Sequence, residues 1–264
     1  MKNWLRILLI VLSGCGIGFI NGFLGGGGGV LVVAVFLALY ALPQKNAHAT
    51  ALLVILPISL ISALVYLLNG SVDWEYTLFA TIGVVAGGAA GALLLNRLSG
   101  NVVKLIFSLL LLRGTRTPSM ATTSRSGLTV WLIVFGFISG ILGGMGMGGG
   151  TLLIPLLNFL DIEQQTIQAI NLISFLPMAC VALGLHFKNK LVKPRHTLWM
   201  IAPACAFCIL GALLTKNTSS EVLKICFGVF MLLLGVWQLI LSVRQMVKER
   251  KTDKERSLFF DTEN

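Results

Sequence analysis

The near absence of charge along most of the chain constrains its fold more than any other feature. Ninety consecutive positions between Arg6 and Arg97 contain only three charged residues, Lys45, Asp73 and Glu75. Only 11% of all residues are charged, whereas a soluble domain carries about 25%. Long apolar stretches without charge are typical of transmembrane helices. The sequence therefore predicts an all-α, polytopic membrane protein.

The second half of the chain repeats the first. The stretch "GFINGFLGGGGGVLVV" at Gly18 matches "GFISGILGGMGMGGGTLLIP" at Gly136, with a few extra residues in the second copy. The match then continues at a near-constant offset of about 120 positions, as when Pro57 aligns with Pro177. Small-residue coincidences are common in membrane sequences, but a constant offset over about a hundred residues indicates an internal duplication.

Each half contains five apolar segments. We expect one membrane domain made of repeat 1 (about 14–112), a connector (113–127), repeat 2 (about 128–243) and a basic tail (244–264). The predicted segments of repeat 1 are 5–24, 29–42, 49–68, 76–95 and 100–112, and those of repeat 2 are 128–146, 150–160, 167–187, 197–215 and 222–243.

Loop charges predict how the two halves are related. Basic residues mark cytoplasmic loops, so a cytoplasmic amino terminus places Lys45, the "KNKLVKPR" loop (188–195) and the carboxyl-terminal tail inside. Asp73, Asp161 and their acidic neighbours then lie outside. Five crossings per half make the repeats inverted, a common transporter architecture. The connector disagrees, because its three arginines fall outside in this count and segment 100–112 is short.

The net charge of +10 does not indicate a nucleic-acid partner. Six basic residues fall in the last 21 positions and most others flank apolar segments, which favours membrane topology and contact with anionic lipids. Cys205 and Cys208 form a C-x-x-C inside an apolar segment, where we expect small buried residues rather than redox chemistry. The three histidines lack adjacent acids and metal-ligand spacing, so no enzyme, metal or cofactor is predicted.

The glycine runs admit three interpretations. A phosphate-binding loop is disfavoured, because no strand precedes either run and no Lys-Ser/Thr follows. Close helix packing explains glycines spaced four apart, since small residues let helix backbones approach. Three such series occur: Gly14, Gly18, Gly22 and Gly26; Gly136, Gly140, Gly144 and Gly148; and Gly83, Gly87 and Gly91. Packing alone does not explain five consecutive glycines.

The third interpretation is a broken helix in each half. The apolar segments that follow the two glycine runs are too short to span a bilayer. Short, glycine-interrupted segments at corresponding positions of two halves point to a transporter's binding site. Unwound backbone N–H groups and the positive end of the following half-helix would form an anion site. A membrane scaffold whose glycines serve only packing remains the alternative.

Neutral polar residues are the other candidates for such a site. The side chains that could face a central cavity are Asn21, Ser139, Thr50, Asn171 and Ser174. His48 and His186 lie at or near segment ends, where we expect interfacial or helix-end residues rather than proton acceptors. No charged residue lies near the centre of an apolar segment, so a usual intramembrane proton relay is missing and passive, voltage-driven anion export is possible in principle.

The glycine-rich motifs resemble those of the sulfite exporter TauE/SafE family. The resemblance is carried by "GFINGFLGGGGGVLVV…NAHATALLVILPISLISALVYLLNGSVDW" and by "GFISGILGGMGMGGGTLLIP", and it covers about residues 12–240. The first copy departs in having Ala34 opposite Pro155. The resemblance implies transport of a small sulfur-containing anion, such as sulfite, thiosulfate, sulfoacetate or another sulfonate, across a bacterial inner membrane.

Together with the polar candidates, the resemblance implies a substrate site. Its expected residues are Gly25, Gly26, Gly27, Gly28, Gly29, Thr50, Gly143, Gly144, Gly146, Gly148, Gly149, Gly150 and Asn171. The identity of the anion, the direction of transport and the oligomeric state are left open by the sequence.

Overall fold

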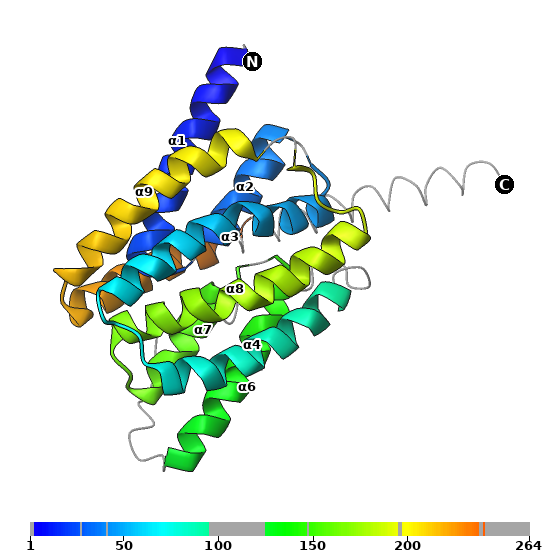
Figure 1. The fold of residues 1–264 in the computed structure, drawn as a ribbon. Coiled ribbons are helices and arrows are strands. Elements are labelled where there is room, and N and C mark those ends of the chain that lie inside the picture. Colours follow the sequence, from blue (N-terminus) through cyan, green and yellow to red (C-terminus); the bar gives the residue numbers. More distant parts are fainter. Residues whose placement is uncertain are drawn as a thin grey trace.

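The protein is built from helices arranged around two short ones. The computed structural model describes residues 3–26, 28–40, 42–94, 125–146, 148–194, 197–237 and 240, and every regular element in these ranges is a helix (Figure 1). Seven described helices are long and apolar enough to cross a membrane: α1 (Asn3–Leu24), α3 (Gln44–Leu68), α4 (Trp74–Leu94), α6 (Arg125–Gly144), α8 (Gln164–Lys188), α9 (Leu198–Lys216) and the helix Ser220–Trp237. The predicted polytopic helical class is confirmed.

The two remaining helices are too short to span a bilayer. They are α2 (Gly28–Tyr40) and α7 (Gly150–Leu157), the latter extended by the 3-10 turn η1 (Asn158–Leu160). At 1.5 Å per residue, α2 is about 20 Å long, against a hydrocarbon core of about 30 Å. Both follow a glycine run, as the sequence predicts. The predicted segment 100–112, most of the connector and the basic tail lie outside the described residues.

Two helices begin earlier than their apolar segments do. α3 starts at Gln44 instead of residue 49, and α8 starts at Gln164 instead of residue 167. In each case the first turn is polar, so hydropathy alone places the start too late. Each helix is 25 residues long, about 37 Å, and contains one of the two aligned prolines, Pro57 or Pro177.

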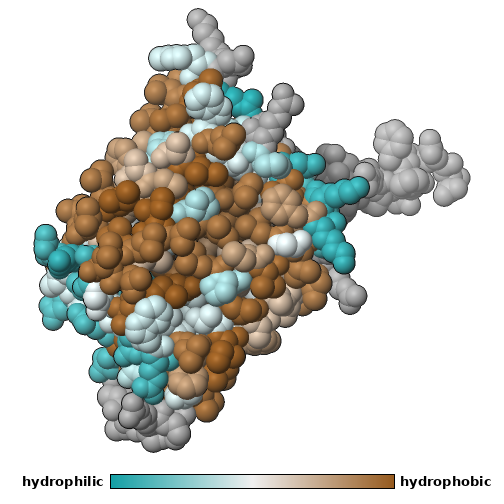
Figure 2. All heavy atoms as spheres, in the orientation of Figure 1, coloured by the Kyte–Doolittle hydropathy of each residue, from teal (hydrophilic) through white to brown (hydrophobic). Residues whose placement is uncertain are grey.

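The outer surface is apolar over a broad band and polar at its two ends. Figure 2 shows hydrophobic residues covering the middle of the visible face, with hydrophilic residues gathered at opposite edges. Large exposed apolar side chains of the long helices include Leu64, Leu78, Ile82, Leu210 and Leu213. Such a band suits contact with lipid tails, where exposed apolar side chains lose nothing.

The two polar ends carry opposite charge. At the basic end, Asn46 beside Lys45 donates a hydrogen bond from Nδ2 to the Leu191 carbonyl (2.8 Å), which places the 188–195 loop there. At the same end Arg6 donates to the Leu39 carbonyl (2.6 Å) at the end of α2. At the acidic end a single surface pocket is lined by Asp73, Asp161 and Glu163, and also by Leu128 at the start of α6. α1 and α6 therefore begin at opposite ends of the molecule.

Glycines bring two helix pairs into backbone contact. α1 packs on α9 and α4 packs on α6 (Figure 1). A Cβ atom added to Gly18 or Gly22 of α1 would overlap the backbone of α9, and one added to Gly140 or Gly144 of α6 would overlap that of α4. For these positions the packing interpretation of the four-residue glycine spacing is supported by the contacts.

We expect Gly18→Ala to destabilise the protein, because its new methyl group would collide with the Ala204 carbonyl and force α1 away from α9. Overpacking of this kind costs about 1–3 kcal/mol. Gly16→Ala is the matched control: it lies on the same helix with no heavy atom within 4 Å of an added Cβ. Thermal unfolding in detergent should show a lowered midpoint for the first variant only, and equal midpoints would contradict the packing role.

Candidate functional site

The backbone leaves the helical conformation at both glycine runs. α1 ends at Leu24 and α2 begins at Gly28, while α6 ends at Gly144 and α7 begins at Gly150. In these breaks Gly25, Gly146 and Gly148 have φ angles of 67°, 75° and 77°. Residues with a side chain rarely adopt positive φ, so glycine is required here for conformation as well as for space.

The two breaks lie against one another. A Cβ atom on Gly29, in the first turn of α2, would stand 3.1 Å from the Cα atom of Gly148 in the second break. On the other side of the first break, a Cβ atom on Gly26 would stand 2.7 Å from the Asn171 Nδ2 atom of α8. The chain thus brings together, backbone to backbone, two glycine runs that are about 120 residues apart in sequence.

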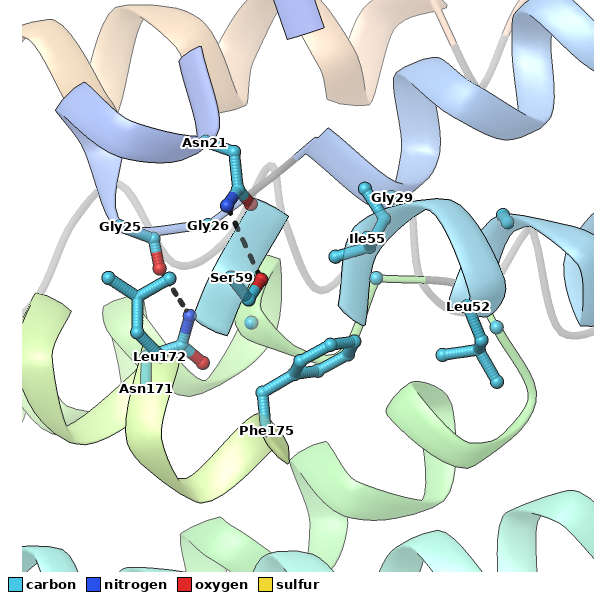
Figure 3. A pocket seen from close by; sticks show the side chains of 14 residues that line it. Asn21, Gly25, Gly26, Gly29, Leu52, Ile55, Ser59, Asn171, Leu172 and Phe175 are labelled. Carbon is cyan, nitrogen blue, oxygen red and sulfur yellow. Dashed lines mark hydrogen bonds between the residues drawn. The ribbon is translucent and has the colours of Figure 1, made fainter. Parts of the chain in front are cut away.

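A small internal cavity lies where the breaks meet (Figure 3). It leaves about 20 Å³ for solvent, which is room for about one water molecule. Its lining consists of Asn21, Gly25, Gly26, Gly29, Ala51, Leu52, Ile55, Ser59, Gly146, Gly148, Gly150, Asn171, Leu172 and Phe175. None of these lining residues is charged, so an anion placed there would meet only neutral dipoles.

Three polar side chains reach the cavity. Asn171 is 5% exposed and donates from Nδ2 to the Gly25 carbonyl (2.6 Å), which ties α8 to the first break. Asn21 donates from Nδ2 to the Ser59 Oγ atom (3.3 Å), which joins α1 to α3. Figure 3 shows these two hydrogen bonds on either side of the first break, with the Phe175 ring facing them from α8.

The apolar part of the lining follows the internal repeat. α3 and α8 contribute residues at matching positions, 120 apart in each case: Ala51 with Asn171, Leu52 with Leu172, and Ile55 with Phe175. The two helices therefore present the same helical face to the cavity. The pairs differ in polarity at one place, where α8 has an asparagine and α3 an alanine.

Seven of the predicted site residues line the cavity. They are Gly25, Gly26, Gly29, Gly146, Gly148, Gly150 and Asn171. Gly28 instead faces the Asn21 side chain, and Gly143 and Gly149 pack against each other within the second half. A Cβ atom on Gly144 would overlap the backbone of Gly88 in α4, which is a packing contact. Gly27 lies outside the described residues.

Thr50 is not part of the lining. Its buried Oγ1 atom accepts a hydrogen bond from the Lys193 backbone N–H (3.0 Å), so it anchors the loop at the basic end. The neighbouring Ala51 faces the cavity instead. The sequence did not predict that Ser59 and the apolar residues of α3 and α8 line the cavity. Most of these residues form pairs that are 120 positions apart. Once Asn171 was chosen, the same offset could have indicated Ala51 and the residues beside it.

Buried side chains support the first break from outside the cavity. The Tyr66 hydroxyl contacts the Gly22 carbonyl (3.1 Å), the Gln168 Oε1 atom (2.8 Å) and the Thr215 Oγ1 atom (3.2 Å). The Gln168 stem lies against Gly25, where an added Cβ atom would overlap it. One network therefore joins α3, α8 and α9 at the end of α1.

Two histidines support the second break. His48 on α3 contacts the Gly146 carbonyl through Nδ1 (3.1 Å), and His186 on α8 contacts the Gly144 carbonyl through Nε2 (2.8 Å). They are 4% and 0% exposed. Both lie near helix ends, as expected, but they are buried inside the protein rather than interfacial, because the carbonyl groups freed at the break require buried partners.

Both cysteines of the C-x-x-C motif lie inside the membrane-spanning helix α9. Cys205 and Cys208 both lie within α9 as free thiols, and the Cys208 Sγ atom contacts the Cys205 carbonyl (3.2 Å). Among the described residues, no three His, Cys, Asp or Glu side chains are grouped so that they could hold a metal ion.

We expect Tyr66→Phe to lower the stability of the protein, because it removes the hydroxyl and leaves the buried Gln168 oxygen without that donor. Loss of one buried hydrogen-bond partner costs about 1–3 kcal/mol. Tyr76→Phe, at the acidic surface pocket, is the control and should change stability by less than about 0.5 kcal/mol. Equal unfolding midpoints for both variants would contradict a supporting role for Tyr66.

The chain matches the sulfite exporter TauE/SafE family over residues 1–114 and 131–260. A probable membrane transporter protein of Xylella fastidiosa strain Temecula1 is 29% identical over 252 residues, covering 85% of this chain and 92% of that protein. One from strain 9a5c is 31% identical over 182 residues, covering 62% and 67%. The probable membrane transporter protein YunE of Bacillus subtilis is 32% identical over 103 residues, 38% of each chain.

No solved structure matches this chain. The family match extends over both glycine breaks and nearly the whole sequence, and the two Xylella relatives are described as transporters and not as enzymes. The resemblance noted in the glycine motifs is therefore confirmed, and the protein belongs to the sulfite exporter TauE/SafE family of membrane transporters.

Proposed function

We propose that the protein carries small anions, above all sulfur oxyanions and organosulfonates, across a bacterial inner membrane. The observation that carries this proposal is the uncharged cavity at the meeting point of two glycine breaks. α2 and α7 both begin beside it, at Gly28 and Gly150. The first N–H groups of a helix lack partners within the helix, and they carry a partial positive charge. Two such ends pointing at one place form a site for an anion.

Neutral binding groups suit a carrier better than fixed charges do. An arginine or lysine in the cavity would hold an anion strongly, because electrostatic attraction is weakly screened in a medium of low dielectric constant. Amide groups and helix ends offer weaker attraction, so the anion can be released as well as bound. Asn171 and Asn21 supply amide groups at the cavity in addition to the helix ends.

The proposed architecture is a pair of inverted repeats, residues 14–112 and 128–243. It is supported by the start of α1 at the basic end and of α6 at the acidic end. It is supported also by the packing between the halves. The first helix of each half packs on the fourth helix of the other half, as α1 does on α9 and α6 on α4. Gly18 faces Ala204 as Gly140 faces Val84. By these contacts, Gly18 in the first half is equivalent to Gly140 in the second half. The sequence match instead aligns Gly18 with Gly136, which is one helical turn earlier.

Transport by this site requires the lining helices to move. Sulfite and larger oxyanions exceed the volume of a water molecule, which is about all that the cavity admits. We infer that α3 and α8, which face one another across the cavity, separate at one end or the other to admit the anion. Alternating access in inverted-repeat transporters occurs by such movement of one part against another.

The substrate class rests on the family, since the names of the relatives state no substrate. A small carboxylate is the alternative substrate, and a scaffold whose glycines serve only packing is the alternative function. A counterflow screen on purified protein in proteoliposomes decides among them, with sulfite, thiosulfate, sulfoacetate, taurine and acetate as probes. Exchange of the sulfur anions supports the proposal, exchange of acetate alone replaces the substrate class, and no exchange favours the scaffold.

The membrane orientation follows from charge. We propose that the basic end, the amino terminus and the tail 244–264 face the cytoplasm, as the positive-inside rule predicts, with the tail contacting anionic lipids. The anionic substrate and the lipid bilayer are then the proposed partners, with no nucleic acid and no cofactor. The proposed site needs residues of one chain only, so it is compatible with a monomer and with a homo-oligomer.

We expect Asn171→Asp to abolish anion exchange without unfolding the protein. The substitution keeps the shape of the side chain but removes the donor to the Gly25 carbonyl and adds a negative charge, which repels an anion. A loss of at least tenfold in counterflow rate is expected, corresponding to about 1.4 kcal/mol or more.

Asn217→Asp is the matched control, because it makes the same chemical change at an exposed position after α9. Its exchange rate should equal that of the wild type. Full exchange by the Asn171 variant would exclude the cavity as the anion site.

We also expect net efflux to respond to membrane voltage. A potential of 100 mV contributes about 2.3 kcal/mol per charge to the movement of an anion away from the negative side. Potassium diffusion potentials in proteoliposomes should therefore accelerate net efflux of a substrate anion. Flux that is insensitive to voltage but strongly dependent on pH would overturn uncoupled transport and indicate proton coupling.

A further inference from the structure

α8 begins with a buried glutamine whose side-chain amide makes no hydrogen bond within the described part of the chain. Gln164 is 0% exposed, and neither its Nε2 nor its Oε1 atom has a hydrogen-bond partner there. An unpaired buried amide destabilises a folded protein, since its interactions with water are lost and not replaced. An apolar residue of similar shape would be better for folding alone, so this amide is expected to have another task.

The spacing of polar residues along α8 relates this glutamine to the cavity. Gln164, Gln168 and Asn171 are spaced i, i+4 and i+7, which places them on one face of the helix. Asn171 lines the cavity, and Gln168 lies against Gly25 of the first break. The series begins immediately after Glu163, at the acidic end. It therefore forms a polar stripe from the acidic surface to the cavity.

α3 carries the corresponding stripe from the other end. Gln44, His48 and Ala51 have the same spacing and stand 120 positions before the residues of α8. Ala51 lines the cavity, and His48 lies against Gly146 of the second break. The Gln44 Nε2 atom is buried and has no partner among the described residues. This stripe begins beside Lys45, at the basic end.

We propose that these two stripes are the two halves of the substrate path, one between the cavity and each surface. The unpaired Nε2 atoms of Gln44 and Gln164 are outer contacts that donate N–H groups to the passing anion. The inference rests on the proposed function, because it assigns a route to the anion of the central site. A neutral amide suits such a contact, since it can bind an oxyanion without retaining it.

The acidic-end stripe is closed in this structure by Tyr66. Its hydroxyl lies 2.8 Å from the Gln168 Oε1 atom, so the middle residue of the stripe is held to α3. Passage of an anion along α8 requires this contact to open. The same movement would separate α3 from α8 at the acidic end and expose Gln164.

Adjacent glutamines allow a sharp test. Gln164→Met removes the unpaired amide, and Gln165→Met removes an amide that donates from Nε2 to the Thr215 and Thr218 carbonyls (3.1 and 3.0 Å). We expect the Gln164 variant to keep or raise the unfolding temperature and to lose at least tenfold in the flux of radiolabelled sulfite. The Gln165 variant should show the reverse, with a lowered unfolding temperature and retained flux.

Unchanged flux in the Gln164 variant would overturn the proposal. So would a flux that falls together with the unfolding temperature, because that pattern indicates a structural amide. If the wild type itself carries no sulfite, the proposed substrate fails, and the path is then decided by a measurement that needs no substrate.

That measurement is the accessibility of introduced cysteines. The background is a chain whose five cysteines are replaced by alanine and whose folding is verified by size-exclusion chromatography. Gln164→Cys and Gln44→Cys are introduced into it one at a time. Each variant is treated from one side of the membrane at a time with 2-sulfonatoethyl methanethiosulfonate, a membrane-impermeant anion. We expect the two positions to react from opposite sides. Ile170→Cys, 0% exposed and off the polar face of α8, is the control and should not react. Reaction of both from the same side, or of neither, would overturn the proposal.

Discussion

The contact between the two glycine breaks is the constraint on which the rest of the structure depends. Where a helix breaks inside a membrane, its freed N–H and C=O groups must find partners within the protein, since lipid offers none. The Gly25 carbonyl is bound by Asn171 and the Gly146 carbonyl by His48, and both of these side chains come from the other half of the chain. Within its own half, the second break is supported by His186, which contacts the Gly144 carbonyl. Each break therefore depends on the other half for one of its carbonyl partners.

The glycine-spaced helix pairs fix where the breaks lie along α1 and α6. Because each added Cβ would overlap a backbone atom of the partner helix, α1 cannot slide along α9 without clashes, and the same holds for α6 on α4. The last packing glycine before the first break is Gly22, three residues from Gly25. Gly144, the last in α6, lies two residues from Gly146. In each series, the earlier glycines pack against a partner helix and the later ones form the break. The packing and the broken-helix interpretations therefore both apply, each to a different part of the series.

The sequence predicts the helices and the breaks well because both depend on composition along the chain. Charge-free segments of spanning length became helices, and both glycine runs interrupted them. The inward face of each helix is harder to predict, because a membrane helix is apolar all round and its hydrophobic pattern does not distinguish core from lipid. Thr50 was chosen as a polar residue near the glycine runs, yet it turns toward a loop while its neighbour Ala51 faces the cavity.

The sequence did not predict the burial of two histidines, for a related reason. His48 and His186 stand near the ends of apolar segments, where a position at the membrane interface is the usual outcome. Their burial follows from the carbonyl groups of a break that is distant in sequence and adjacent in space. No pattern within one segment contains that information. The offset of 120 contains part of it, since His48 and Gln168 occupy equivalent positions, and each lies against the break of the opposite half.

The cavity lining differs between the two halves, and this difference affects how a ligand could bind. The two halves line the cavity with equivalent residues of α3 and α8, but of these two helices only α8 contributes an amide, at Asn171, and its counterpart is Ala51. The cavity therefore has an amide toward α8, whereas α3 contributes apolar residues and the Ser59 hydroxyl. Under the proposed function, an oxyanion with one apolar end, such as an organosulfonate, would bind with its oxygens toward Asn171. The proposed inverted repeats would then open alternately to the two sides, while the asymmetric lining would hold the substrate in one orientation.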